Sequence, residues 1–472
     1  MFRNAAHLFP ALAFACLICG GVGYSCYCEW VEPGPGDDLT LLCILAGADR
    51  RPRRANTVRD RLAPLNEVAT WSDEFFRRQY RITRAEFALL REALLPHLRP
   101  RSVAMGNVGS GGIIPVDTKI LITLRMMAGA MYLDMVWYRV AVNHVNEYMM
   151  EIVEAMNSCA YLDNINLPKT EAEVRRVQSE WDAVSKIKHG CTQIEGTIGA
   201  VDGYQTAIRR PSNTECEAMG VNPDAFFYRK GFFAVLACGV CDAYGQFMYW
   251  GMRNPGATND IVAYEQTGLK EEFAAGKPMS AGHFVMDEAY ACIGGNHHLC
   301  PYSKHQLTAA RRANDMERLD SMLVFNNRLS SQRITVERAF GMLLRRWGMF
   351  WHDMAYTVAD TISITTACVR LHNLCILRWR AQHGNSPIVA DGDGPLVPPP
   401  AAAFEAEGLG RARPDAPGGG DVDARVEVVA NGVAPAPGAR VRTSPRREEL
   451  RRRLWDMGYT IHADRHAAAM QD

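Results

Sequence analysis

The sequence predicts a mixed α/β sheet with flanking helices, preceded by a small all-helical domain, so the fold class is α/β and the chain is α+β overall. Apolar, strand-like runs recur between residues 196 and 287, and helical patterns follow them to residue 378. Residues 71–156 show only helical periodicity. The order strand, strand, strand, helix, strand and then helices is that of one mixed sheet covered by helices.

We divide the chain into five predicted parts. They are an unplaced N-terminal segment (1–65), a helical domain (66–185), a mixed α/β domain (190–380), a disordered linker rich in Pro, Gly and Ala (381–443) and a basic C-terminal helix and tail (444–472). A chain of 472 residues is long enough for two or three such units with their own cores.

The formal net charge is +0, which excludes a global attraction to nucleic acid. Arginines nevertheless cluster at residues 50–61 and 446–453, where they permit a local phosphate contact or only a solvated tail. Residues 1–28 begin with an apolar run that predicts a signal peptide or a marginal membrane span, or is an error in the predicted gene. The sequence does not separate these three interpretations.

The predicted helical domain contains a candidate helix-turn-helix. Thr83–Glu86 (TRAE) is a capping box, and helices are expected to about Pro96, over Val116–Gly129 and over Asp134–Trp137. A turn near residues 140–143 leads to a helix that buries Val145, Tyr148, Met149, Ile152 and Met156 and exposes His144, Asn146 and Glu147. This exposed face offers weak base-reading chemistry, and a plain helical bundle fits the pattern equally well.

Fourteen cysteines are present, without the repeated spacing of a zinc site. Cys238 and Cys241 form a CxxC pair, but they lie in a strand-like apolar run with no second pair. Buried free thiols are therefore the preferred interpretation.

Residues Ser331–Phe350 (SQRITVERAFGMLLRRWGMF) predict a helix around which the rest of the chain is organised. Its expected buried stripe is Ile334, Phe340, Leu343, Leu344 and Trp347. Glu337 lies among apolar neighbours, where a partly desolvated carboxylate needs a partner. Either Arg333, one turn earlier, or a metal ion shared with other carboxylates would meet this need.

Carboxylates stand at the ends of two predicted strands. Asp202 follows the strand that begins at Gly196, and Asp287 ends the strand that begins at His283. Each is compatible with an ordinary turn or cap, and Asp260 with a helix N-cap. Their order together with Glu337 favours a site for Mg²⁺ or Mn²⁺, and two such ions activate a water or a 3′-hydroxyl in phosphodiester cleavage.

The sequence resembles the PIF/Harbinger-type DDE transposases and the nucleases derived from them, over about residues 71–378. The motifs that carry the resemblance are KILITLRMMAGAMYLD (119–134), VDG (201–203), YRKGFF (228–233), PGATND (255–260), MDEAY (286–290), RITVERAFGMLLRRW (333–347) and LHN (371–373). Each motif alone is weak, but their joint order is specific. The resemblance implies a ribonuclease-H-like catalytic domain at residues 190–380.

Matching motif to motif, the resemblance implies that Asp202, Asp287 and Glu337 are the catalytic acids and metal ligands, with Asp260 as a further ligand. In such sheets the first and fourth strands are neighbours, so Asp202 and Asp287 should lie side by side. Candidate phosphate contacts are Arg229, Lys230, Arg338, Arg345 and Arg346. Arg345 and Arg346 fit a solvated helix face equally well.

Two positions depart from the pattern of the family. Gln205 and Asn259 stand where its members often have His. All four acids are present, so metal binding is expected, but the two changes fit a decayed or domesticated copy.

The resulting hypothesis is a metal-dependent DNA endonuclease or strand-transferase that acts in the nucleus, with the cytoplasm as a second location. Its expected partners are DNA, a separate Myb-like DNA-binding protein and further copies of the chain, without a small-molecule cofactor. The alternatives are a domesticated, inactive DNA- or protein-binding module and, from residues 1–28 alone, a secreted or membrane-anchored protein.

Overall fold

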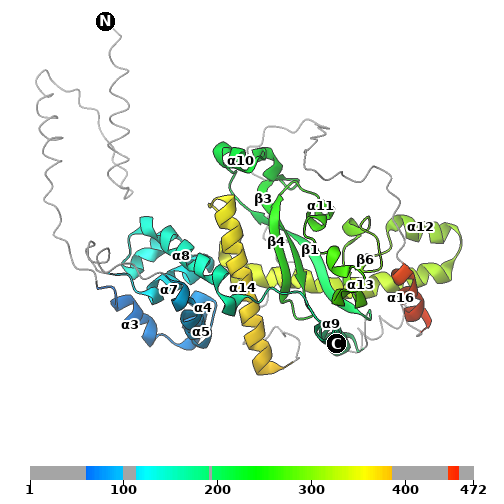
Figure 1. Ribbon diagram of the computed structural model, residues 1–472, viewed down its shortest axis with the longest axis horizontal. Helices are drawn as coiled ribbons and strands as arrows, with labels where there is room; N and C mark the ends of the chain where they lie inside the picture. Colours follow the sequence, from blue (N-terminus) through cyan, green and yellow to red (C-terminus); the bar gives the residue numbers. More distant parts are fainter. Residues whose placement is uncertain (1–59, 99–112, 191–193, 385–444, 457–472) are drawn as a thin grey trace, which may run out of the picture. The chain divides into compact units, whose positions relative to one another are not determined.

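The computed structural model describes residues 60–98, 113–190, 194–384 and 445–456 (Figure 1). The apolar N-terminal run and most of the predicted linker lie outside these residues, so the predictions about them remain predictions. No helix in the described part of the chain is long and apolar enough to cross a membrane.

A six-stranded mixed sheet forms the centre of the α/β region and confirms the predicted fold class. The strands are β1 (Thr197–Ala207), β2 (Phe227–Tyr228), β3 (Phe232–Cys241), β4 (Phe247–Pro255), β5 (His283–Val285) and β6 (His298–Leu299). They are ordered β2-β3-β1-β5-β6, and β4 pairs with β3. The pairs β1–β3 and β3–β4 are antiparallel, whereas β1–β5 and β5–β6 are parallel.

The sequence of β3 explains its central position. The strand is an almost continuous apolar run that is buried along nearly its whole length, as expected for a strand covered on both faces. Asp242 closes the turn into β4, because its Oδ1 accepts hydrogen bonds from the backbone N–H groups of Tyr244 and Gln246, both at 2.9 Å. Gly245 supplies the positive φ of 84° that this turn requires.

The N-terminal helices agree in kind with the predictions. They are α3 (Ala63–Thr70), α4 (Asp73–Tyr80), α5 (Arg84–Leu94), α7 (Val116–Met127), α8 (Val145–Ser158) and α9 (Glu171–His189), with a 3₁₀ helix at Tyr132–Tyr138. The capping box of Thr83 and Glu86 is confirmed. The five apolar residues expected inside α8 are buried, and His144, Asn146 and Glu147 are exposed.

The division into domains stays a prediction. Buried side chains of α7, α8 and the sheet belong to one hydrophobic cluster, and α8 packs against α14 (Val358–His383). The two predicted boundaries at 185 and 380 both fall inside helices, namely α9 and α14.

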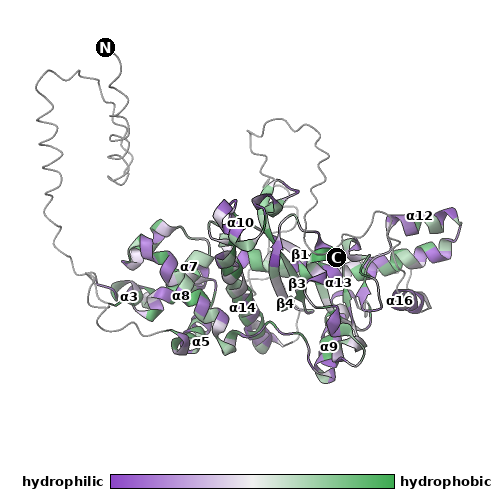
Figure 2. Ribbon diagram, turned by 45° about the horizontal axis from the view of Figure 1, so that its top comes forward, coloured by the Kyte–Doolittle hydropathy of each residue, from purple (hydrophilic) through white to green (hydrophobic). Residues whose placement is uncertain are grey.

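The remaining helices lie around the sheet or extend beyond its edge (Figure 1). They are α10 (Asn213–Met219), α11 (Asp260–Glu265), α12 (Lys304–Arg312), α13 (Met316–Arg346) and α16 (Pro445–Asp456). The α13 helix packs against β1, β3 and β5, and α16 packs against α13. The ribbon of α16 is mostly hydrophilic in Figure 2, in agreement with the basic helix predicted there.

Helix α13 corrects the prediction for Ser331–Phe350. It begins well before Ser331 and ends at Arg346, and a 3₁₀ helix at Gly348–Trp351 follows. Ile334 is 40% exposed and Leu344 is half-buried, so these two residues were wrongly assigned to the buried stripe. Val336, Phe340, Leu343 and Trp347 are buried.

The LHN motif fixes α14 to the β3–β4 turn. His372 Nε2 lies 3.0 Å from the carbonyl oxygen of Gly245. The Asn373 side chain accepts a hydrogen bond from the backbone N–H of Phe247 at 2.8 Å and donates to the carbonyl oxygen of the same residue at 2.7 Å. Both motif side chains are fully buried, so this motif has a structural role.

The described cysteines are free thiols, as predicted. Cys238 and Cys241 lie three residues apart on β3, both are buried, and no disulfide joins any two described cysteines.

Candidate active site

The first two acids lie on neighbouring parallel strands. In the β1–β5 pair Ala200 is opposite Val285. Asp202 and Asp287 each stand two residues beyond these partners, so the predicted adjacency of the two strands is confirmed. Asp287 Oδ1 accepts a hydrogen bond from the backbone N–H of Glu288 at 2.7 Å, which orients the carboxylate at the start of the following 3₁₀ turn.

The prediction that Asp202 ends its strand is wrong. β1 continues to Ala207 because its antiparallel partner β3 pairs with it from Ala200 to Ala207, whereas β5 pairs with it only as far as Ala200. Asp202 is therefore at the end of the parallel pairing but inside the antiparallel one. The side chain is held there by a hydrogen bond from the backbone N–H of Gly203 to its Oδ1, at 2.8 Å.

Glu337 reaches the same region from α13, and Arg333 bridges the two elements. The Arg333 guanidinium lies 2.5 Å from Glu337 Oε1 and 3.9 Å from Asp202 Oδ2. Arg333, one of the two alternative partners considered for Glu337, is thus in contact with it. The predicted desolvation is wrong, because the Glu337 side chain is 44% exposed.

Asp260 is held against Gly203 at the first turn of α11. A Cβ atom at Gly203 would lie 2.7 Å from Asp260 Oδ1, so only glycine leaves room for this carboxylate. Asn259, which the sequence marked as a departure from the family, is the N-cap of α11, since its Oδ1 accepts a hydrogen bond from the backbone N–H of Ile261 at 2.9 Å. It thereby fixes the residue next to Asp260.

The other departure, Gln205, also has a structural partner. Its Nε2 donates to the carbonyl oxygen of Gly256 at 3.2 Å, in the loop that leads to Asp260. Both replacements therefore hold the PGATND loop in place.

The electrostatics of the acids show that they are neighbours. Burial raises the pKa of Asp202 to about 6, and the charges of Asp287 and Glu337 add to this shift, while the Gly203 N–H and Arg333 oppose it. Burial also raises the pKa of Asp260, the charge of Asp287 adds to the increase, and Arg229 opposes it. Carboxylates held this close together disfavour one another's ionisation, and a cation among them relieves the repulsion. In this structure the Arg333 guanidinium is that cation.

Sequence reasoning missed Tyr290, which lies near three of the acids. Its ring is buried against Tyr264, with centroids 6.0 Å apart. Burial raises the pKa of the hydroxyl, and the charges of Asp260, Asp202 and Asp287 contribute. Its place in the MDEAY motif, three residues after the second acid, was the available signal.

The donor set fits a hard divalent cation, although the side chains do not form a ready cage. Carboxylate oxygens from β1, α11, α13 and the second residue after β5 are the ligands that Mg²⁺ and Mn²⁺ prefer. However, no group of three or more His, Cys, Asp or Glu side chains in the described residues is arranged to hold a metal ion. The Arg333 guanidinium instead lies between Asp202 and Glu337.

The five candidate phosphate contacts do not form one surface. Arg229, Lys230 and Arg338 are exposed, and the Arg229 guanidinium lies 5.8 Å from the centre of the Tyr228 ring. Arg345 is half-buried. Arg346 is only 7% exposed and donates to the carbonyl oxygen of Arg81 at 3.1 Å, a position that favours a structural role for its side chain.

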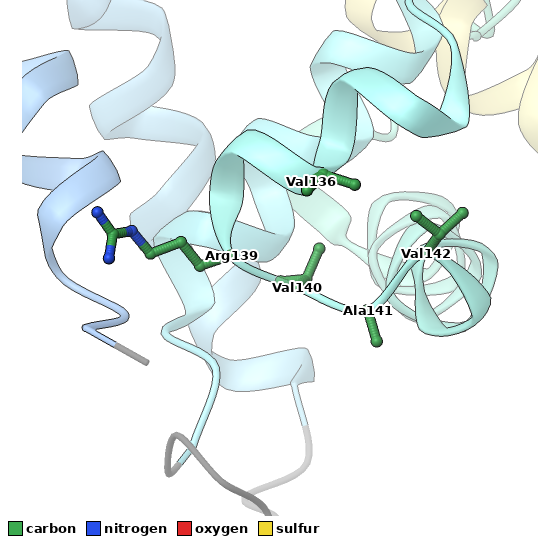
Figure 3. Close-up of a pocket in the computed structure, with 5 residues that line it drawn as sticks. All are labelled: Val136, Arg139, Val140, Ala141 and Val142. Atoms are coloured by element: carbon green, nitrogen blue, oxygen red, sulfur yellow. The ribbon is translucent and has the colours of Figure 1, made fainter. Parts of the chain in front are cut away.

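A surface hollow lies apart from the acids, at the turn of the candidate helix-turn-helix. It is lined by Val136, Arg139, Val140, Ala141 and Val142. Figure 3 shows the Arg139 side chain extending away from the three valines. The hollow contains no carboxylate, so it is not part of the candidate active site.

Comparison with known proteins finds similarities over the segment that contains the acids. Residues 201–373 match the family described as DDE superfamily endonuclease, a range that contains all four acids. The chain is also similar to the protein named "Putative nuclease HARBI1", with 23% identity over 244 residues in Bos taurus and 22% over 244 residues in Homo sapiens. No solved structure matches.

These similarities cover part of each protein. Both matches span 51% of this chain and 60% of the relative. The Rattus norvegicus protein of the same name is 27% identical over 114 residues, or 24% of this chain and 28% of the relative. Residues 201–373 are therefore similar to the DDE superfamily endonucleases, and the chain that carries them resembles, at modest identity, a protein named as a putative nuclease.

Proposed function

We propose that the chain is a divalent-metal-dependent DNA endonuclease of the Harbinger type. It hydrolyses phosphodiester bonds and passes the freed 3′-hydroxyl end to target DNA. The observation that carries the proposal is the meeting of Asp202 and Asp287, on neighbouring parallel strands, with Glu337 from α13 inside a DDE endonuclease domain.

Asp202, Asp287 and Glu337 are the proposed ligands of Mg²⁺ or Mn²⁺, with Asp260 as a further ligand. DDE superfamily endonucleases generally use divalent metals, which lower the pKa of a nucleophilic water and stabilise the leaving oxygen. The chain itself contributes the positions of the acids. Asp202 is fixed by Gly203, Asp260 is packed against Gly203, and Glu337 is held by Arg333.

DNA is the proposed substrate, because the domain belongs to an endonuclease family and exposed basic residues flank the acids. Arg229 and Lys230 follow β2, and Arg338 follows Glu337 on α13. Action in the nucleus, a separate Myb-like partner and self-association are further parts of the proposal that follow from the family resemblance alone.

The test is nicking of supercoiled plasmid DNA by the full chain, with Mg²⁺, with Mn²⁺ and with a chelator. We expect nicking only with metal, and a loss of at least 100-fold in Asp202→Asn and in Glu337→Gln. Glu171→Gln is the matched control, since Glu171 is an exposed acid in an i,i+4 pair with Arg175, like Glu337 with Arg333. Metal-independent nicking, or equal loss in the control, would contradict the proposal.

A second candidate is a DNA- or protein-binding module that has lost the chemistry. Two observations favour it: the Arg333 guanidinium lies between Asp202 and Glu337, and the described acids form no ready metal cage. Calorimetry of the full chain with Mg²⁺ and Mn²⁺ distinguishes the candidates. Binding that is lost in Asp202→Ala and Glu337→Ala supports the endonuclease, whereas an absence of binding in the presence of DNA supports the module.

A further inference from the structure

Three helices end close together, and each carries an arginine in its last turn or at its C-cap. α4 carries basic residues in its last turn and is followed by Arg81, α7 has Arg125 in its last turn, and α13 ends with Arg345 and Arg346. Arg346 Nη1 donates to the carbonyl oxygen of Arg81 at 3.1 Å, and Arg125 Nη1 donates to that of Gln79 at 3.5 Å. We call Arg78, Arg81, Arg125, Arg345 and Arg346 the arginine junction.

The guanidinium groups of the junction lie close enough to repel one another. Burial, followed by the charges of Arg125, Arg346, Arg78 and Arg345, lowers the pKa of Arg81. No carboxylate is among the groups that act on Arg81. Such a concentration of like charge is unfavourable unless an anion compensates it.

Helix capping accounts for part of this charge. The C-terminus of a helix carries about half a negative charge, so three ends offset about 1.5 of the five positive charges. Glu86 and Asp134, two carboxylates of the neighbouring helical segments, are engaged as helix caps: Glu86 accepts from the Thr83 N–H, and Asp134 from the Met131 N–H. Counting them in full still leaves a net positive charge of about 1.5.

Two members of the junction are available to a ligand. Arg78 is exposed and Arg345 is half-buried, and neither has a hydrogen bond or ion pair among the described residues. Capping therefore explains Arg125 and Arg346 but leaves Arg78 and Arg345 without a structural reason for their charge.

An aromatic groove of about 410 Å³ adjoins the junction and shares Arg125 with it. Its aromatic lining is Trp71, Phe75, Tyr80, Trp137 and Tyr138. The rings of Trp71 and Trp137 lie 5.6 Å apart, and Trp137 is 37% exposed. Exposed aromatic rings beside arginines are the combination that stacks unpaired bases and binds their phosphates.

We propose that the arginine junction and the aromatic groove form a DNA-binding surface that holds a DNA strand beside the cleavage site. Arg78 and Arg345 contact phosphates of this strand, and the groove holds an unpaired base. The inference rests on DNA being the substrate. Arg345 lies eight residues after Glu337, or about 12 Å along α13. At about 3.4 Å per nucleotide this places the contacted backbone three to four nucleotides from the scissile phosphate.

The test measures DNA binding by the full chain in chelator, so that cleavage plays no part. The probes are a fluorescent blunt duplex and the same duplex with an unpaired end, titrated at several salt concentrations. We expect the Arg78→Gln/Arg345→Gln double variant to bind the blunt duplex at least tenfold more weakly and to lower the salt slope by about two, the value for two lost phosphate contacts.

Arg175→Gln/Arg311→Gln is the charge-matched control, because both arginines are exposed and lie on α9 and α12, away from the junction. It should keep the wild-type salt slope. Trp137→Ala should weaken binding of the unpaired end more than binding of the blunt duplex. Wild-type affinity and slope in the junction variant, or an equal loss in the control, overturns the proposal.

The DNA-binding surface and the proposed endonuclease function can fail independently of each other in these tests. Junction-dependent DNA binding without any metal-dependent nicking would remove the endonuclease assignment and keep the DNA-binding surface. Metal-dependent nicking by a junction variant that binds DNA normally would keep the endonuclease and remove the surface.

Discussion

Replacing Asp202 with Asn should stabilise the metal-free protein at neutral pH. Burial is the main reason that the pKa of this carboxyl rises from 3.8 to about 6, so the folded state binds the proton more tightly than the unfolded state. The stability that this proton provides is fully present below about pH 4 and is lost as the pH rises to 6. A shift of two pKa units corresponds to about 3 kcal/mol.

An uncharged Asn avoids that loss. At pH 7.5 in chelator we expect Asp202→Asn to be more stable than wild type by about 1–3 kcal/mol, and at pH 4.5 we expect the difference to fall towards zero. Thermal unfolding followed by circular dichroism at both pH values measures this. Burial also raises the pKa of Asp242 to about 6, so only the difference between variant and wild type isolates Asp202.

Added Mg²⁺ or Mn²⁺ should reverse this order, so that wild type becomes more stable than Asp202→Asn. A ligand that binds only the folded state stabilises it by about 2.7 kcal/mol at 100 times its dissociation constant, and the variant lacks one of the ligands. Asp224→Asn, at an exposed aspartate, is the control and should follow wild type throughout. If Asp202→Asn is less stable than wild type at pH 7.5 in chelator, burial does not destabilise the ionised Asp202 carboxylate, and the electrostatic argument for the site fails.

Three further changes test the site and its support. The Arg333→Gln variant should bind Mg²⁺ at least tenfold more tightly than wild type, measured by calorimetry, because the guanidinium competes with the metal for Asp202 and Glu337. Weaker binding would mean that Arg333 orients the acids instead. The Gly203→Ala variant should displace the Asp260 carboxylate and reduce DNA nicking at least tenfold, without lowering the melting temperature by more than a few degrees. Unchanged nicking would exclude Asp260 from the site. Asn373→Ala should cost about 2–4 kcal/mol, measured by urea unfolding, since the buried N–H and carbonyl groups that it bonds lose their partner; a cost below 1 kcal/mol would refute a structural role for the motif.

The sequence predicts only some of the contacts that Arg333 makes with the acids. The i,i+4 spacing made Arg333 one of two alternative partners of Glu337, because helical residues four apart are neighbours, and the structure contains this ion pair. The approach of Arg333 to Asp202 depends on how α13 packs against β1, and no local pattern encodes that packing. The exposure of Glu337 was wrongly predicted for the same reason.

The position of Asp202 illustrates the limit of strand prediction. Its Gly neighbour suggested a turn, but β3 continues the antiparallel pairing to Ala207. Pairing between strands decides where a strand ends, and the partner strand is distant in sequence. Similarly, the burial of Arg346 depends on the C-terminus of α4, more than 200 residues earlier in the chain.

The sequence by itself determined the fold class, the helices with clear caps and periodicity, and the ordered motifs that place four acids in the segment similar to DDE superfamily endonucleases. These features are local or lie in a fixed linear order, so they survive in a single sequence. Only the tertiary structure decided which charges meet: Arg333 between two acids, Asp260 against Gly203, and five arginines at three helix ends. Electrostatic energies depend on distance and burial, and both arise from packing between segments that are far apart in the chain.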